Sequence, residues 1–116
     1  MDDEKPLEWR GSSLRDIKND EIFTPNARRE AGRQLSQVQI GGDPDHWKAF
    51  GEVGAGVKEI IVDLDNGWFR VMYVAKFPEA IYVLHCFKKK SNATAKHDKD
   101  VAAMRYKDLA QERSKT

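Results

Sequence analysis

Three consecutive lysines close an apolar run in the C-terminal third of the chain. The run Ala80–Lys88, with the sequence AIYVLHCFK, continues directly into Lys89 and Lys90. Adjacent ammonium groups repel one another, so a negatively charged partner would explain their placement. The same run contains His85, whose side chain can accept or donate a proton near neutral pH. These residue types fit the binding of a polyanion, with proton transfer beside it.

Each of these features also has a structural interpretation. Lysines at the end of a strand commonly prevent edge-to-edge aggregation. The apolar residues Ile81, Val83 and Phe87 share one alternation of the strand. Because His85 is in phase with them, it could be a core histidine with satisfied hydrogen bonds. Its neighbour Cys86 would point to the opposite face, and no paired Cys or His spacing occurs elsewhere, so the sequence predicts no metal site.

The composition is that of a small domain without a global charge signal. The chain has 116 residues, 40% hydrophobic and 34% charged, and its 20 Lys+Arg against 19 Asp+Glu leave a formal net charge of +1. Nucleic-acid binding would therefore depend on local clusters of cations. The single cysteine excludes an internal disulfide framework and fits a reducing compartment. No apolar run is long enough to span a bilayer, so we expect one cytoplasmic domain over 1–116 without membrane contact.

The N-terminal part predicts a strand and a pair of helices. Lys5–Trp9 is typical of a short strand, and Ser12 or Ser13 could cap a short helix after it. A second helix is predicted from Thr24-Pro25, which joins a capping hydroxyl to a proline suited to the first helical turn. Gly41-Gly42 ends this helix. Its apolar residues at helical spacing are Ala27, Ala31, Leu35 and Val38.

The segment Gly41–Gly56 is rich in turn formers, and we expect a loop that is anchored by its apolar side chains. These anchors are Trp47, Phe50 and Val53. Three antiparallel strands should follow in a meander, because β-branched and aromatic residues dominate and Asp65-Asn66-Gly67 is a hairpin-turn signature. The predicted strands are Val57–Asp63, Trp68–Lys76 and Ala80–Lys88.

A C-terminal helix that ends in the polar tail QERSKT is predicted from apolar residues at helical spacing. These residues are Val101, Ala102, Met104, Tyr106 and Leu109. The whole order is strand, helix, helix, three strands, helix. It predicts an α+β domain, in which the N-terminal strand and helical pair pack on a twisted antiparallel sheet and both faces of the sheet are at least partly covered.

With these elements, the chain resembles the RelE/ParE superfamily of small bacterial toxins, and within it the HigB-like, phage-derived branch. The resemblance covers about Pro6 to Leu109. It is carried by GAGVKEI at Gly54–Ile60, FRVMYVAKF at Phe69–Phe77 and YVLHCFKKKSNATAKHD at Tyr82–Asp98. It implies the RelE/ParE-like fold and a ribosome-dependent endoribonuclease that cuts messenger RNA. It also implies a cognate antitoxin, commonly a helix-turn-helix protein, and no small-molecule cofactor.

The resemblance also implies site residues. Arg70 matches the arginine of the family's "yRv" strand motif, and Lys89 and Lys90 match its "F.KK" motif. We expect Arg70, Lys89 and His85 to be catalytic. RNA binding is expected from Lys58, Lys88, Lys90 and Lys96. The clearest departure is Ile61, because many relatives carry arginine in the corresponding "ElR" motif.

The chemistry of metal-free RNA cleavage agrees with this assignment. The reaction needs activation of the ribose 2′-hydroxyl, stabilisation of negative charge on the phosphorus and protonation of the leaving 5′-oxygen. A guanidinium such as that of Arg70 can contact two phosphate oxygens and stays charged. A lysine could transfer the proton if neighbouring cations lowered its pKa. Alternatively, Arg70 could simply pair with Glu59 or Asp63 across the sheet.

A second function class remains open from the sequence. Toxins of the ParE type inhibit DNA gyrase through a protein interface and need no acid-base residue. The missing cation at Ile61 keeps this alternative open. Trp47, Trp68 and Phe69 could stack on bases, but large aromatic residues are more often part of a core or face a protein partner.

Overall fold

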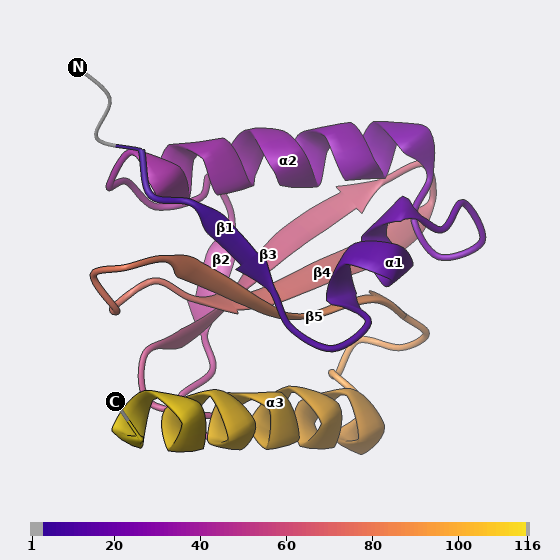
Figure 1. The fold of residues 1–116 in the computed structure, drawn as a ribbon. Coiled ribbons are helices and arrows are strands. Elements are labelled where there is room, and N and C mark those ends of the chain that lie inside the picture. Colours follow the sequence, from indigo (N-terminus) through magenta and orange to yellow (C-terminus); the bar gives the residue numbers. More distant parts are fainter. Residues whose placement is uncertain (1–3, 116) are drawn as a thin grey trace.

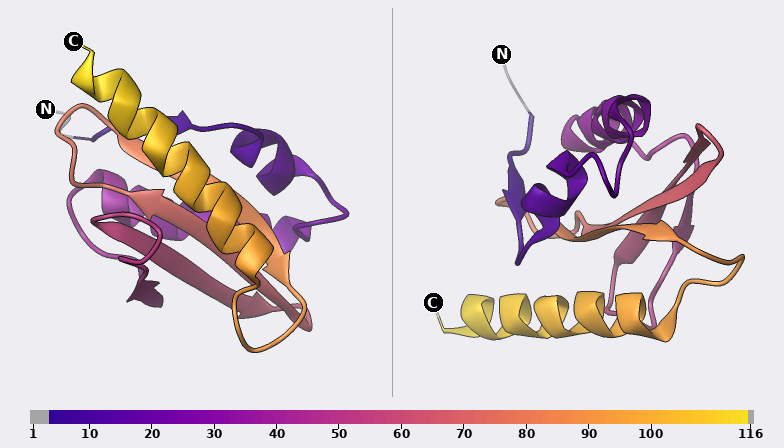
Figure 2. Two further views of the ribbon diagram at one scale, coloured as in Figure 1. Left: turned by 90° about the horizontal axis from the view of Figure 1, so that it is seen from below. Right: turned by 90° about the vertical axis from the view of Figure 1, so that its right-hand side faces the viewer.

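The computed structural model describes residues 4–115 and shows one sheet between two helical layers (Figure 1). The five strands lie in the order β1-β5-β4-β3-β2. Helix α2 covers one face of the sheet and helix α3 the other, and both views in Figure 2 agree. The strands are β1 Leu7–Trp9, β2 Trp47–Ala49, β3 Val57–Leu64, β4 Gly67–Val74 and β5 Ile81–Lys89; the helices are α1 Ser13–Lys18, α2 Pro25–Gln39 and α3 Lys96–Ser114. The predicted α+β fold class is confirmed.

Helix α2 forms as its sequence predicts. The hydroxyl of Thr24 accepts a hydrogen bond of 3.1 Å from the backbone N–H of Ala27, and Pro25 occupies the first turn. The helix's apolar stripe is buried against the sheet. The chain leaves the helix at Gly41, which has a φ of 96°, a conformation that glycine adopts without a Cβ clash.

The β3–β4 hairpin is also confirmed, and the structure identifies its central residues. Leu64 pairs with Gly67, and Asp65 and Asn66 between them have φ values of 53° and 58°. Two consecutive left-handed residues characterise the type I′ turn, which matches the twist of the strands. The carboxylate of Asp65 also accepts a hydrogen bond of 2.7 Å from the hydroxyl of Thr24, so the turn is joined to the start of α2.

The loop expected over Gly41–Gly56 contains a strand that the sequence reading missed. Trp47–Ala49 pairs antiparallel with β3 as the edge strand β2. All of its residues are exposed, so it has no alternation of apolar and polar residues to reveal it. Phe50 and Val53 are buried anchors, as predicted, whereas Trp47 is 37% exposed and is not an anchor.

The predicted C-terminal helix is confirmed. It begins at Lys96 and ends at Ser114, within the polar tail QERSKT. Its buried residues Ala102 and Leu109 pack on the sheet face opposite α2, together with Met72 and Phe87. No helix within residues 4–115 combines the length and the apolar character needed to cross a membrane.

Strand parity assigns each side chain to one of two faces. We call the face covered by α2 the α2 face, and the face that α3 partly covers the α3 face. On β4, Phe69, Val71 and Tyr73 belong to the core beneath α2. The alternate residues therefore point to the α3 face, which Met72 and Val74 confirm by packing in the second core. Trp68 and Arg70 share the parity of Met72.

A β-bulge in β5 changes this parity part-way along the strand. Tyr73 pairs with Val83 but Met72 pairs with His85, so Leu84 is the extra residue. Ile81 and Val83 belong to the core beneath α2, whereas residues beyond the bulge are shifted by one position. The expectation that His85 is in phase with Ile81 and Val83 is therefore wrong. It is in phase with Phe87 only, on the α3 face.

Candidate functional site

Two of the predicted site residues lie together on the α3 face. Arg70 is directly opposite Phe87, and Lys89 is directly opposite Trp68, so Arg70 and Lys89 belong to the same face of neighbouring strands. Both are largely buried, with exposed fractions of 6% for Arg70 and 8% for Lys89. Residues separated by more than fifteen positions in the sequence thus form one cationic centre through the β4–β5 pairing.

The Arg70 guanidinium is held by two carboxylates of β3. Its Nη1 lies 2.7 Å from Asp63 Oδ1 and also donates a 2.9 Å hydrogen bond to the backbone oxygen of Phe69. Its Nε lies 3.7 Å from Glu59 Oε1, which is an ion-pair distance but too long for a hydrogen bond. The pairing with Glu59 or Asp63 that the sequence left open is present with both residues. It fixes the orientation of the guanidinium.

Glu59 is the buried carboxylate of this centre. Its side chain is fully buried, and one of its oxygens accepts a hydrogen bond of 3.2 Å from the hydroxyl of Thr94. Burial raises the pKa of Glu59, and the positive charge of Arg70 opposes that rise. Thr94 lies in the segment between β5 and α3, so this hydrogen bond ties that segment to β3.

The ammonium of Lys89 is held close to the sheet. Its Nζ donates a 2.6 Å hydrogen bond to the backbone oxygen of Asn92. Burial is the main cause that lowers the pKa of Lys89, and the nearby charge of Arg70 lowers it further. A lysine with a lowered pKa is better suited to proton transfer than an exposed one. The pKa of Lys89 is therefore lowered, as the lysine run had suggested. The causes are burial and the charge of Arg70 rather than the adjacent lysines.

The lysine run is divided between the two faces of the sheet. Lys88 points to the α2 face, where its Nζ lies 5.6 Å from the centre of the Phe69 ring. At the end of the strand, Lys88, Lys89 and Lys90 nevertheless line one cavity of about 320 Å³. The start of α3 lines the other side, through residues that include His97 and Asp98. Lys96 is not among the lining residues; it is highly exposed and pairs with Asp100 at 2.6 Å.

His85 lies on the α3 face but is enclosed. Its ring stacks on Phe87 with centroids 4.7 Å apart, and its Nε2 lies 2.8 Å from Asp98 Oδ1 on α3. Only 7% of the residue is exposed. Burial lowers the pKa of His85, and Asp98 opposes this effect. Such an imidazole joins α3 to the sheet, and its geometry suits that role better than contact with a substrate.

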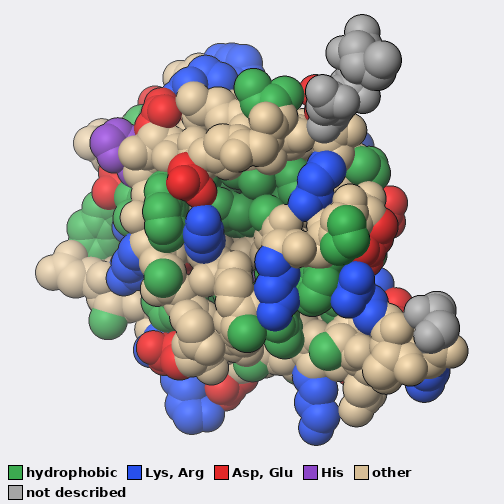
Figure 3. Space-filling view, turned by 90° about the vertical axis from the view of Figure 1, so that its left-hand side faces the viewer, with side chains coloured by type: hydrophobic (Ala, Val, Ile, Leu, Met, Phe, Trp, Pro, Cys, Tyr) green, Lys and Arg blue, Asp and Glu red, His purple; other side chains and the backbone are tan. Residues whose placement is uncertain are grey.

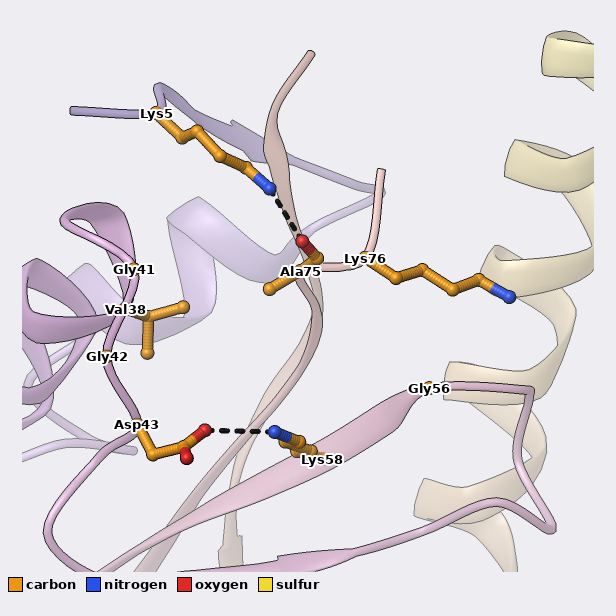
Figure 4. A pocket seen from close by; sticks show the side chains of 9 residues that line it. All are labelled: Lys5, Val38, Gly41, Gly42, Asp43, Gly56, Lys58, Ala75 and Lys76. Atoms are coloured by element: carbon orange, nitrogen blue, oxygen red, sulfur yellow. Dashed lines mark hydrogen bonds and ion pairs between the residues drawn. The ribbon is translucent and has the colours of Figure 1, made fainter. Parts of the chain in front are cut away.

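Lys58 lies on the other face of the sheet. It pairs with Asp43 at 2.9 Å and its Nζ lies 4.3 Å from the centre of the Trp47 ring. Figure 4 shows it in a cavity of about 310 Å³ that Lys5 and Lys76 also line. Figure 3 shows the side of the molecule at the left of Figure 1, which is hollowed and carries several Lys and Arg side chains. Lys58 does not join Arg70 and Lys89.

A family model matches most of the chain. Residues 21–107 match the family model described as "Phage derived protein Gp49-like (DUF891)". The chain belongs to the Gp49-like family. This is a RelE/ParE-type, toxin-like family. No curated protein and no solved structure matches the chain at a significant level.

The site of this Gp49-like chain includes residues that the sequence reading did not assign. Lys48 of β2 is directly opposite Glu59 and so belongs to the α3 face, but β2 itself was not predicted. Thr94 gave no signal, because its hydrogen bond depends on how the segment after β5 folds back. Ile61 is directly opposite Arg70 on β3. An apolar side chain therefore stands beside Arg70 where many RelE/ParE-type relatives carry arginine.

No cluster of metal-binding residues accompanies these cations. Among residues 4–115, no group of three or more His, Cys, Asp or Glu side chains is arranged to hold a metal ion. Cys86 is buried in the core beneath α2, on the face opposite His85, and burial raises the pKa of its thiol well above the usual range.

Proposed function

We propose that this Gp49-like protein is the toxin of a toxin–antitoxin pair and cleaves messenger RNA on the ribosome. The observation that supports the proposal best is the placement of Arg70 and Lys89 on neighbouring strands of one sheet face, where carboxylates and burial hold them in place. Membership in a toxin-like family supports the same class of activity. The resemblance to HigB-like toxins implies an antitoxin partner, commonly with a helix-turn-helix.

In this mechanism Arg70 binds the scissile phosphate. Its guanidinium can contact two phosphate oxygens and stabilises the negative charge that grows as the 2′-oxygen attacks the phosphorus. Lys89, whose pKa is lowered, takes the proton of the 2′-hydroxyl in its neutral form or gives a proton to the departing 5′-oxygen in its charged form. The ribosome holds the message extended, which supplies the alignment that an enclosed pocket would otherwise provide.

Induced expression, with mapping of RNA ends on translating ribosomes, tests the proposal. Arg70→Ala leaves Glu59 buried beside an empty space, so it can lower stability as well as activity. The double variant Glu59→Gln, Arg70→Met removes both charges and separates the two effects. We expect it to fold and to lose about 10²-fold or more of the cleavage rate. Arg29→Ala, which removes an exposed cation of α2, is the matched control and should cut as the wild type does.

The ParE-type alternative has one observation in its favour, namely that Arg70 is already paired with carboxylates in the free protein. The same experiment separates the two functions. New RNA ends at codons on translating ribosomes support the proposal. Their absence during growth arrest, together with inhibition of supercoiling by purified gyrase, would replace it with the ParE-type function.

A further inference from the structure

An exposed indole lies beside the cationic centre. Trp68 is directly opposite Asp63 on β3 and Lys89 on β5, and it is two residues from Arg70 on β4. Two residues along a strand span about 7 Å, so the indole and the guanidinium lie within reach of one nucleotide. Of the Trp68 residue, 39% is exposed, although it is flanked by strands on both sides. No hydrophobic cluster of the described residues includes it.

Two other aromatic residues that could stack on bases, Phe69 and Trp47, do not share that position. Phe69 is fully buried in the core beneath α2. Trp47 is 37% exposed, almost as much as Trp68, but its cross-strand partner Ile60 belongs to the core beneath α2. Trp47 therefore lies on the α2 face, next to Lys58. The two exposed indoles thus differ chiefly in which face of the sheet they occupy.

We propose that Trp68 is a stacking platform for an unpaired base, next to the phosphate that Arg70 and Lys89 bind. This inference rests on the proposed function for the identity of the ligand as RNA. Aromatic rings bind splayed bases through their π faces, without a strong preference for sequence, and cations beside the ring bind the backbone. Trp68 lies between Lys89 on one side and Asp63 on the other, and Asp63 is paired with Arg70. A phosphate that displaces Asp63 from Arg70 would leave Trp68 beside two cations, which favours a polyanion over an apolar protein surface. A protein partner on Trp68 is the competing interpretation that the experiment must exclude.

Binding of a single-stranded oligonucleotide tests the inference. A labelled 2′-O-methyl RNA cannot be cleaved through its 2′-position, so the affinity of the full-length protein can be measured by fluorescence anisotropy at low salt. Trp68→Ala should weaken binding about tenfold or more, the range expected for one base–aromatic stack. Trp68→Phe should retain most of the affinity because it keeps a ring. Trp47→Ala is the matched control and should bind as the wild type does.

A second probe separates stacking from a general loss of the surface. An abasic oligonucleotide of the same length keeps the phosphates and lacks the bases, so it should bind wild type and Trp68→Ala equally. Equal weakening with both probes, or no weakening with either, would overturn the inference. Unchanged RNA affinity with lost capture of the co-expressed antitoxin would assign Trp68 to the protein partner instead, and would also overturn it.

The outcomes for Trp68 and for the proposed function are distinguishable. If the wild type cuts messenger RNA on ribosomes and Trp68→Ala binds the oligonucleotide normally, the proposed function stands and the stacking role fails. If Trp68→Ala loses base-dependent binding but the wild type produces no RNA ends, the stacking role stands and the nuclease proposal fails. Anisotropy with the oligonucleotide measures binding alone, and mapping of RNA ends on ribosomes measures cleavage alone.

Discussion

Arg70 Nη1 lies 2.7 Å from Asp63 Oδ1, so a carboxylate already occupies the part of the guanidinium that would bind a phosphate. The side chain of Asp63 is 52% exposed, whereas that of Arg70 is 8% exposed. A phosphate can therefore displace Asp63 from the solvent side without moving Arg70, which Glu59 and the backbone oxygen of Phe69 continue to hold. Under the proposed function, Asp63 is therefore expected to compete with the RNA phosphate for Arg70.

Replacing this competitor should strengthen RNA binding. Asp63→Asn keeps the shape of the side chain and removes its charge, so we expect the affinity for a 2′-O-methyl oligonucleotide to rise roughly two- to fivefold, in keeping with the small energy of a half-exposed ion pair. Anisotropy at low salt measures the change. Asp65→Asn, at the exposed turn, removes the same charge away from Arg70 and serves as the control. Weaker binding by Asp63→Asn would contradict the competitor role.

Variants of Lys89 distinguish two possible roles of this residue, namely binding RNA through its positive charge and transferring a proton. Lys89→Met should abolish cleavage, because it removes both. Lys89→Arg keeps a positive charge that does not dissociate at any relevant pH, so it should retain RNA binding but lose about 10²-fold of the cleavage rate if Lys89 transfers a proton. Rates from purified ribosome complexes and anisotropy measure the two properties. An arginine variant that cuts at the wild-type rate would restrict Lys89 to an electrostatic role.

The pH dependence of cleavage gives a further check on Lys89. Burial and Arg70 lower its pKa, so the neutral form becomes available at a lower pH than for an exposed lysine. If Lys89 is the base, the cleavage rate of the wild type rises with pH until the pH exceeds the lowered pKa. This rise should be missing in the Lys89→Arg variant. A parallel rise in both proteins would assign it to another group or to the ribosome.

The buried His85 should make the stability of the folded protein depend on pH. Because burial lowers its pKa in the folded protein, the unfolded chain binds a proton more readily. Its contribution to stability is thus complete above the unfolded pKa of about 6.5 and is lost as the pH falls through the lower folded pKa. Between pH 7 and pH 5, wild type should lose more stability in urea unfolding than His85→Gln. Equal losses would show that the Asp98 pair cancels the effect of burial on this pKa.

Replacing a single exposed residue of the β3–β4 turn should have a large effect on stability. Asn66 has a φ of 58°, which β-branched residues strongly disfavour. Asn66→Val should therefore cost about 1–2 kcal/mol of stability. Asn66→Gly, which adopts this conformation freely, should be neutral or slightly stabilising. Thermal unfolding measures both, and equal melting temperatures for the two variants would show that the turn rearranges without cost.

Much of the fold follows from local sequence, because its causes act between near neighbours. The cap at Thr24 and the glycine at Gly41 bound α2, and the residues before Gly67 form the hairpin turn. The strand β2 could not be found in this way, since three exposed residues have no pattern and gain strand geometry only by pairing with β3. Alternation along β3 would have placed Lys58 on the α2 face. For Lys88, alternation from Ile81 and Val83 would have given the α3 face, and only the bulge at Leu84 moves it to the α2 face.

The sequence by itself determined the residue types of the site, and the tertiary structure decided their states. The sequence alone shows that Arg70 and Lys89 are cations. The burial of both residues, the distances from Arg70 to Glu59 and Asp63, and the lowered pKa of Lys89 depend on which strands become neighbours. The bulge at Leu84 likewise decided the face on which His85 lies. The physical reason is that electrostatic and packing energies depend on distances in space, which distant parts of the chain set jointly.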